Sequence, residues 1–227
     1  MSKIPKIIHQ IWIGEKEMPD HCKQFTKEMQ EMHPDWEYHL WGNEIFTDIY
    51  KNDKFLQNYI KQPELFKYAY ISDRIRLLLL RDFGGVYVDV DAKPLKSFNT
   101  ILNKCSENIT FFGGVKRTDC NEKNWMLDCT VYGSAPNSRA INICLDTYKD
   151  INWANGGFMF SEVLMDHLDD DILALGYEYF YSTKPNSKAV VLHDILDTRL
   201  WTWFDKGLNY WFNQNAKIHE AKSKHKL

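Results

Sequence analysis

Hydrophobic positions in the first part of the chain follow two different spacings. A near-continuous apolar run over residues 4–13 predicts a strand covered on both faces, as in a parallel sheet. Residues 15–32 mix charges with scattered apolar positions, which indicates a loop and a surface helix, and the alternating aromatic segment 36–41 indicates a second strand. Residues 44–60 have an imperfect helical period, and Asn43 is expected to cap that helix. Alternation of strand and helix is typical of an α/β fold.

The stretch from Tyr68 to Pro94 begins with helical spacing. Its apolar residues recur at threes and fours and predict one buried helix face: Ile71, Ile75, Leu78 and Leu79. The same spacing places Asp73 and Arg76 together on a neighbouring face. Gly84 and Gly85 follow, where a left-handed backbone conformation can end the helix without a Cβ clash.

The period then changes to two, with valines alternating with Tyr87, Asp89 and Asp91. This pattern predicts a strand that packs its valines on one side and presents both carboxylates on the other, with α-carbons about 6.6 Å apart. Adjacent carboxylates repel each other, so they favour a bound cation. Mg²⁺ or Mn²⁺ takes one or two protein carboxylates and leaves room for water and phosphates, which predicts a diphosphate ligand. The alternative is a solvated strand end, because an Asp-x-Asp pair alone is a weak signal.

The second part of the chain has weaker patterns. Strands are predicted over 109–115 and 189–193, and helices over 138–148 and from about residue 161. The acidic run 166–171 is expected to be a solvated face. No Pro-, Gly- or Ser-rich linker divides the 227 residues, so a single domain is expected.

Composition excludes some classes of partner and site. A net charge of −3 gives no overall positive field for nucleic acid. The basic tail 216–227 is expected to be a frayed end, with weak attraction to anionic lipid as the alternative. Five cysteines without Cys-x-x-Cys spacing indicate reduced thiols rather than a zinc site. Without a long apolar run or a signal-peptide pattern, the expected location is cytoplasmic, with peripheral contact at the inner membrane face as the alternative.

Two separate motifs resemble glycosyltransferase family 32. The first runs from Ser72-Asp73-x-x-Arg76 through Gly84-Gly85-Val86-Tyr87-Val88-Asp89-Val90-Asp91 to Pro94 and resembles that family's DxD region. The second, Ile4 to Gly14, is similar to the family's opening strand. The family includes yeast-type initiating α-mannosyltransferases, bacterial capsular polysaccharide transferases and, more distantly, the glucosylating domains of large clostridial toxins.

The resemblance implies an α/β fold of the GT-A type: a Rossmann-like single domain over residues 1–227, with a mostly parallel central sheet flanked by helices. The nucleotide-sugar part would span about 1–115 and the acceptor side about 116–215, followed by the basic tail. The implied activity is metal-dependent, retaining transfer of a hexose from a nucleotide diphosphate sugar to a carbohydrate hydroxyl. A UDP-sugar donor, an oligosaccharide or lipid-linked glycan acceptor, and a role in cell-surface polysaccharide synthesis are expected.

The resemblance also implies roles for residues around the metal and the donor sugar. Asp91 would bind Mn²⁺ or Mg²⁺, and Asp89 would hold ribose or sugar hydroxyls and reach the metal. Asp73 and Arg76 would grip the donor sugar, and Arg76 would stabilise charge on the leaving phosphate. His193, at the end of a predicted strand, is the candidate third metal ligand, because neutral imidazole suits Mn²⁺; a structural hydrogen bond is its alternative role.

Other residues are expected around the nucleotide and the acceptor. Trp12 would stack on the base, with a place in the core as its alternative role. Ile11 and Tyr87 are also expected to bind the donor, and Thr202-Trp203 stands near the position of the family's Ser-Trp pair. Asp128 replaces the Asn of a family Asn-Ala dipeptide, so it would bind a sugar hydroxyl or merely cap a turn.

Two other functions are considered. A sugar nucleotidyltransferase would use the same metal but normally has a glycine-rich, basic loop after the first strand, which Trp12-Ile13-Gly14-Glu15 lacks. A non-catalytic sugar-binding module would not need Asp73, Arg76 and the paired carboxylates together.

Overall fold

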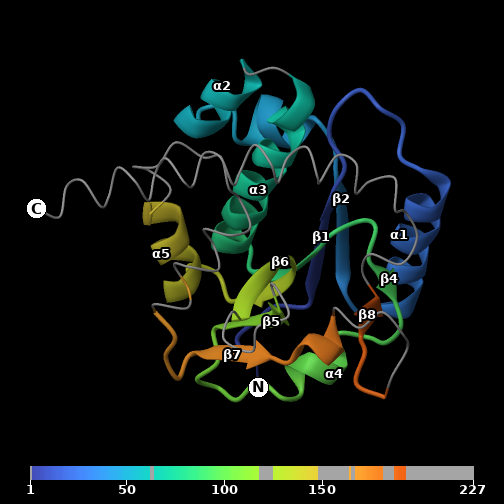
Figure 1. The fold of residues 1–227 in the computed structure, drawn as a ribbon, viewed down its shortest axis with the longest axis vertical. Helices are drawn as coiled ribbons and strands as arrows, with labels where there is room; N and C mark the ends of the chain where they lie inside the picture. Colours follow the sequence, from blue (N-terminus) through green and yellow to red (C-terminus); the bar gives the residue numbers. More distant parts are fainter. Residues whose placement is uncertain are drawn as a thin grey trace, which may run out of the picture.

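The computed structural model describes residues 2–61, 64–117, 125–147, 164, 167–180 and 187–192. A six-stranded sheet with the strand order β2-β1-β3-β6-β5-β7 forms its centre (Figure 1). In that order the strands are β2 (Glu37–Trp41), β1 (Ile7–Ile11), β3 (Gly85–Val88), β6 (Trp125–Ser134), β5 (Phe111–Arg117) and β7 (Ile172–Leu175). A second, two-stranded sheet pairs β4 (Lys93–Pro94) with β8 (Val191–Leu192).

Helices cover both faces of the central sheet, and Figure 1 shows α1 on one side with α3 and α5 on the other. Two buried clusters match this arrangement, one built around α3, α5 and the α2 region and the other around α1 and α4. The helical elements are α1 (Asp20–Met32), the π-helical segment η1 (Ile45–Ile49), α2 (Lys54–Ile60), α3 (Glu64–Asp82), α4 (Asn99–Leu102), α5 (Arg139–Thr147) and the 3₁₀ turn η2 (Tyr177–Tyr179).

The sheet has a parallel part and an antiparallel part. β1 pairs in parallel with β2 and β3, while β6 runs antiparallel to both β3 and β5, and β7 is parallel to β5. β1 and β3 are buried almost throughout, as the apolar run at residues 4–13 predicts. The predicted α/β class with a mostly parallel sheet is confirmed.

The link between α3 and β3 has the predicted glycine turn. Gly84 and Gly85 have φ angles of 66° and 97°, in the region that L side chains rarely adopt. A Cβ at Gly84 would lie 2.6 Å from Pro136 Cδ, and a Cβ at Gly85 would lie 2.5 Å from the Ile7 carbonyl oxygen. Both positions therefore need glycine for conformation and for space.

The helix expected over residues 44–60 is in fact two elements, and its predicted cap is wrong. Asp53 caps α2 instead, because its Oδ1 accepts hydrogen bonds from the backbone N–H groups of Phe55 and Leu56, both at 3.0 Å. Asn43 is used elsewhere: its Oδ1 accepts from the Gly14 N–H at 2.8 Å, and its Nδ2 donates to the Gly14 carbonyl at 3.3 Å. A contact between distant segments thus replaces the local cap.

The strand predicted to hold both carboxylates is shorter than expected. β3 ends at Val88, and Tyr87 is 2% exposed, so the strand is buried on both faces rather than on one. Asp89 and Asp91 lie in the following turn, where the Ala92 N–H donates to the Asp89 carbonyl at 3.1 Å. The prediction that both carboxylates share one strand face is therefore wrong.

Further differences lie in the second part of the chain. β7 follows directly on the acidic run and was not predicted, and Asp171 in that run binds Arg139 through Oδ1 at 2.5 Å instead of facing only solvent. The strand predicted over 189–193 appears as β8, but in the small sheet with β4. The helix expected from about residue 161 and the basic tail lie largely or wholly outside the described residues. Across the described segments, no helix combines the length and apolar character needed to cross a bilayer.

Candidate functional site

Three charged side chains meet at the carboxyl end of β3. Asp73 and Arg76 lie one turn apart on α3, and Arg76 Nη2 is 2.8 Å from Asp73 Oδ1. Arg76 Nη1 is 3.7 Å from Oδ1 of Asp89, the first residue after β3. The residues that the DxD resemblance assigned to the donor sugar are therefore in one cluster.

Tyr87 supports this cluster from within the sheet. Its hydroxyl donates a hydrogen bond to Asp89 Oδ1, and the Arg76 guanidinium carbon lies 4.5 Å from the centroid of its ring. Burial raises the pKa of Tyr87 well above its usual value, so the phenol stays protonated and can donate to the carboxylate. The expected direct contact of Tyr87 with a nucleotide stays a prediction, because the side chain lies beneath Arg76 and Asp89.

The exposure of the cluster decreases inward. The side chain of Asp89 is 26% exposed, that of Asp73 16% and that of Arg76 8%. In such a partly closed environment, charge interactions are stronger than in water. Arg76 is thus held in one orientation by two carboxylates and an aromatic face, with Asp89 closest to solvent.

Asp91 lies two residues further along the same turn and is partly buried next to α1. Burial and the nearby Asp91 carboxylate together raise the pKa of the Cys22 thiol on α1 to about 11. Backbone bonds fix the start of the turn: the Asp89 N–H donates to the Thr130 carbonyl of β6 at 3.0 Å. The Gln10 side chain of β1 also donates to the Asp89 carbonyl, at 3.3 Å.

The donor set of this turn fits a hard divalent cation. The turn carries the carboxylates of Asp89 and Asp91, and with Asp73 they outnumber the single guanidinium of Arg76, so the group as a whole is anionic. Mg²⁺ and Mn²⁺ accept one or two protein carboxylates and complete their shells with water and phosphate oxygens. Within the described segments, no group of three or more His, Cys, Asp or Glu side chains is placed to hold a metal. The predicted third ligand, His193, lies outside those segments.

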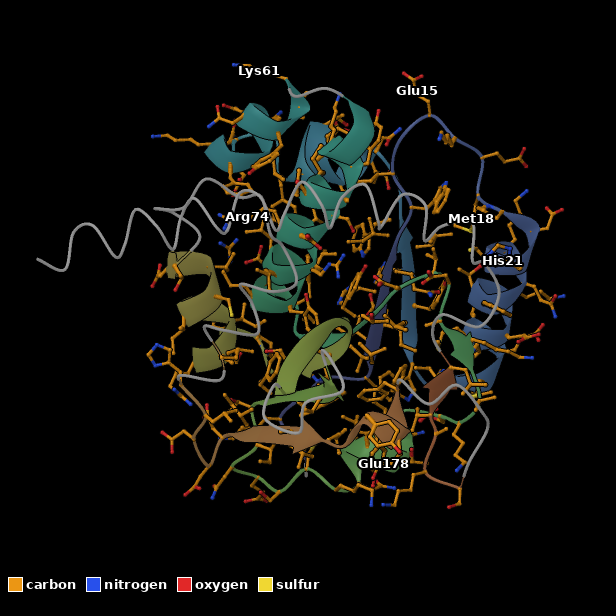
Figure 2. The ribbon with its side chains drawn as sticks, in the orientation of Figure 1. Glu15, Met18, His21, Lys61, Arg74 and Glu178 are labelled. Atoms are coloured by element: carbon orange, nitrogen blue, oxygen red, sulfur yellow. The ribbon has the colours of Figure 1, made fainter. Side chains whose placement is uncertain are left out.

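The loop after β1 borders the same end of the sheet. Ile11 is buried in the core, and Trp12 is half-buried with its indole N–H donating to the Lys16 carbonyl at 2.9 Å. Figure 2 shows Glu15 at the tip of this loop and Met18 and His21 where it leads into α1. Trp12 therefore follows β1 at the edge where Asp89 follows β3, and its stacking on a base stays a prediction.

Two other predicted site residues cannot be placed as side chains. Asp128 lies in β6, but its side chain is not among those the structure describes, and Trp203 lies outside the described residues. The sequence interpretation missed Gln10, which contacts the carboxylate turn directly. A signal was present, because Gln10 and its neighbour His9 are the two polar residues in a strand of isoleucines.

The site lies within a part of the chain that matches a protein-family model. Residues 19–107 match the family described as "Glycosyltransferase sugar-binding region containing DXD motif", and this range includes Asp73, Arg76, Asp89 and Asp91. The match comprises both the helix and the turn that form the cluster.

Curated relatives match the same part of the chain. Mannosyl phosphorylinositol ceramide synthase SUR1 of Saccharomyces cerevisiae is 36% identical over 112 residues, which are 45% of this chain and 28% of the yeast protein. Inositol phosphoceramide mannosyltransferase 3 of Schizosaccharomyces pombe is 33% identical over 104 residues, again 45% of this chain and 28% of that protein. The matched region thus spans less than a third of the length of these two relatives.

Solved structures share the fold. PaToxG glycosyltransferase superimposes with a TM-score of 0.51 at 22% identity, covering 73% of this chain and 70% of that one. An active-site mutant of LgtC superimposes with a TM-score of 0.50 at 10% identity, covering 88% of this chain and 94% of that one. The carboxylate turn and the Asp73–Arg76 pair lie inside the region that is similar to the DXD-containing glycosyltransferases, and the chain shares the GT-A fold of these solved glycosyltransferase structures.

Proposed function

We propose that this protein is a glycosyltransferase that moves a hexose from a nucleoside diphosphate sugar to a carbohydrate hydroxyl, in a metal-dependent reaction that retains anomeric configuration. The observation that supports it best is the ion-paired cluster of Asp73, Arg76 and Asp89 beside the Asp89–Asp91 turn. Open α/β sheets bind ligands beyond the carboxyl ends of their strands, where this cluster lies. A purely structural ion pair would not need this position.

Asp91 and Asp89 are the residues proposed to hold Mn²⁺ or Mg²⁺. A divalent cation held by these two carboxylates would supply positive charge that stabilises the leaving nucleoside diphosphate. Arg76 would donate hydrogen bonds to the donor, since its planar guanidinium suits phosphate and sugar oxygens. Asp73 would accept a hydrogen bond from a sugar hydroxyl while its contact with Arg76 holds the carboxylate in place.

The proposed route is attack on the same face that the diphosphate leaves. Asp73 and Asp89 both contact Arg76, and this pairing reduces their strength as nucleophiles. Neither is therefore proposed to form a covalent glycosyl intermediate. A leaving diphosphate oxygen would instead accept the proton of the acceptor hydroxyl, which gives retention without an enzyme nucleophile.

We propose mannose as the hexose, because the two yeast relatives are a mannosyl phosphorylinositol ceramide synthase and an inositol phosphoceramide mannosyltransferase. The names also describe inositol phosphoceramide, so a lipid-linked acceptor is included with oligosaccharides in the proposal. The expectation of UDP rests on Trp12 alone. A donor panel decides the nucleotide.

The experiment measures hydrolysis and binding of GDP-mannose, UDP-glucose, UDP-galactose and UDP-GlcNAc, with Mn²⁺ and with EDTA. At least one donor should be turned over only with metal, and Asp91→Asn should abolish the metal-dependent part. Incubation with a nucleoside triphosphate and a sugar 1-phosphate tests nucleotidyl transfer in parallel. The proposal fails if no donor is hydrolysed or bound more tightly with metal.

A further inference from the structure

Gln10 is a buried polar residue in the middle of the sheet. It is 0% exposed on β1, between the core residues Ile8 and Ile11. Burying an amide is costly unless its donor and acceptor are both satisfied. Gln10 uses both ends of its amide: Nε2 donates to the Asp89 carbonyl at 3.3 Å, and Oε1 accepts from the Tyr38 hydroxyl at 2.6 Å.

The bond to Asp89 lies where regular pairing between β1 and β3 stops. The paired residues are Ile8 with Val86 and His9 with Tyr87, and β3 ends at Val88. Beyond that point, the Asp89 N–H is held by Thr130 of β6. On the β1 side, the Gln10 side chain takes the place of a backbone partner.

Tyr38 of β2 fixes the orientation of the Gln10 amide. The Tyr38 hydroxyl donates to Oε1, which leaves Nε2 directed at the Asp89 carbonyl. Burial raises the pKa of Tyr38 to about 12, so this hydroxyl stays protonated and can donate to Gln10. Two side-chain hydrogen bonds therefore connect β2 and β1 to the carboxylate turn.

We infer that Gln10 is a positioning residue for the donor site, holding the Asp89 carbonyl so that Asp89 and Asp91 present their carboxylates in one arrangement to the cation and diphosphate. This inference rests on the proposed function. Its physical basis is preorganisation: a turn fixed in the free protein does not have to be ordered on binding. Residues that hydrogen-bond to metal ligands, and so orient them, typically change metal affinity or activity by about 10–100-fold when they are mutated.

The test compares three single variants of the full chain. Gln10→Met keeps a similar side-chain length and removes both hydrogen bonds. Tyr38→Phe removes one hydroxyl and keeps Gln10. The matched control is Gln57→Met on α2, because the Gln57 amide also donates to a backbone carbonyl, that of Lys51 at 2.8 Å, but at an exposed position away from the turn.

The readout is the affinity for Mn²⁺ in the presence of UDP or GDP, measured by electron paramagnetic resonance of the free ion, with thermal unfolding recorded for each variant. Gln10→Met should weaken Mn²⁺ binding by about 10–100-fold. Tyr38→Phe should weaken it by about fivefold, the effect of one hydrogen bond. Gln57→Met should bind Mn²⁺ like the wild type.

The outcomes separate this inference from the proposed function. If Gln10→Met lowers the melting temperature but binds Mn²⁺ and nucleotide like the wild type, Gln10 is only a structural residue and the inference is wrong. If Gln10→Met does not fold, Tyr38→Phe decides, and unchanged affinity in that variant overturns the inference. If the wild type and Gln57→Met themselves bind no Mn²⁺ with either nucleotide, the proposed function has failed instead.

Discussion

Two buried arginines on α3 have nearly the same local chemistry and different surroundings. Counted over the whole residue, Arg74 is 9% exposed and Arg76 is 7% exposed. Each is paired with carboxylate and lies over an aromatic ring, Phe55 for Arg74 at 5.2 Å and Tyr87 for Arg76 at 4.5 Å. Because they are two residues apart, they point to nearly opposite sides of the helix.

The partners of the two arginines differ in what else they do. Arg74, labelled in Figure 2, contacts Asp53 Oδ2 at 2.9 Å, and the other oxygen of Asp53 caps α2. Its ion pair therefore fastens α2 to α3. Arg76 contacts Asp89, which is partly exposed at the carboxyl end of β3. Burial and ion pairing alone do not identify a functional arginine; its position relative to the sheet does.

The largest expected effect is on stability. Arg74→Ala should lower the free energy of unfolding by about 3–5 kcal/mol, because it leaves the largely buried Asp53 carboxylate without its cation. Urea denaturation measures this loss, and the folded fraction should keep its transferase activity. Arg81→Ala is the control on the same helix, since Arg81 is more exposed and pairs with its neighbour Asp82. It should cost less than about 1 kcal/mol. Equal losses for the two variants would contradict the structural role of Arg74.

Arg76→Ala should act mainly on turnover. Removing a cation that stabilises developing negative charge typically costs about 10²–10³ in rate, so metal-dependent donor hydrolysis should fall by that factor. Arg76→Lys should recover only part of it, because lysine lacks the planar fork. Steady-state rates with the preferred donor test this. If Arg74→Ala lowers the rate per folded molecule as much as Arg76→Ala, the assignment of a functional role to Arg76 and a structural role to Arg74 is wrong.

The stability of the fold should also depend on pH, because the buried histidine His9 is neutral in the folded state. This effect is separate from that of the two arginine ion pairs. Burial lowers the pKa of His9 from 6.5 to about 4, while its Nε2 bonds the Gly84 carbonyl and its Nδ1 accepts from Trp41. The folded state therefore binds fewer protons than the unfolded state between those values. This contribution to stability is complete above about pH 6.5 and is lost as pH falls to 4, about 3 kcal/mol in all.

A variant isolates this term. His9→Gln should flatten the decline in unfolding free energy between pH 6.5 and 4, measured by urea denaturation at several pH values. A shallower decline should remain, because burial also lowers the pKa of His33. An unchanged pH profile in His9→Gln would show that the acid sensitivity comes from other groups.

The smallest expected effect separates the two roles of Asp53. Asp53→Asn and Asp53→Ala both remove the charge facing Arg74, but asparagine still caps a helix N-terminus. Asp53→Ala should therefore be less stable than Asp53→Asn by about 1 kcal/mol in urea denaturation. Equal stability of the two variants would mean that the cap contributes nothing beyond the ion pair.

Much of the parallel part of the sheet could be predicted because its signals are local. The apolar run of β1, the helical period of α3 and the glycine turn at Gly84 each follow from neighbouring residues in the sequence. The helical spacing also placed Asp73 and Arg76 on one face, which their ion pair confirms. The roles of these residues came from the family resemblance rather than from the pattern.

What could not be predicted depends on contacts between distant segments. Asparagine is a common helix cap, but the Asn43 side-chain amide is hydrogen-bonded to the backbone of Gly14 instead. The period of two continued to Asp91, but the Asp89 N–H binds Thr130 of β6 and the strand ends before it. β7 is short and follows acidic residues, so its pairing with β5 provides the order that its own sequence does not indicate.

Because the glycine turn between α3 and β3 is tight, the site depends on the number of residues between Arg76 and Tyr87. The Arg76 guanidinium lies over the Tyr87 ring although one residue is on the helix and the other on the strand. The link between the two elements is too closely packed to accommodate an extra residue. One residue inserted between them within α3 would rotate Arg76 by about 100° around the helix axis and turn it away from Asp89. Insertions and deletions in this segment should therefore abolish transfer even where every named side chain is retained.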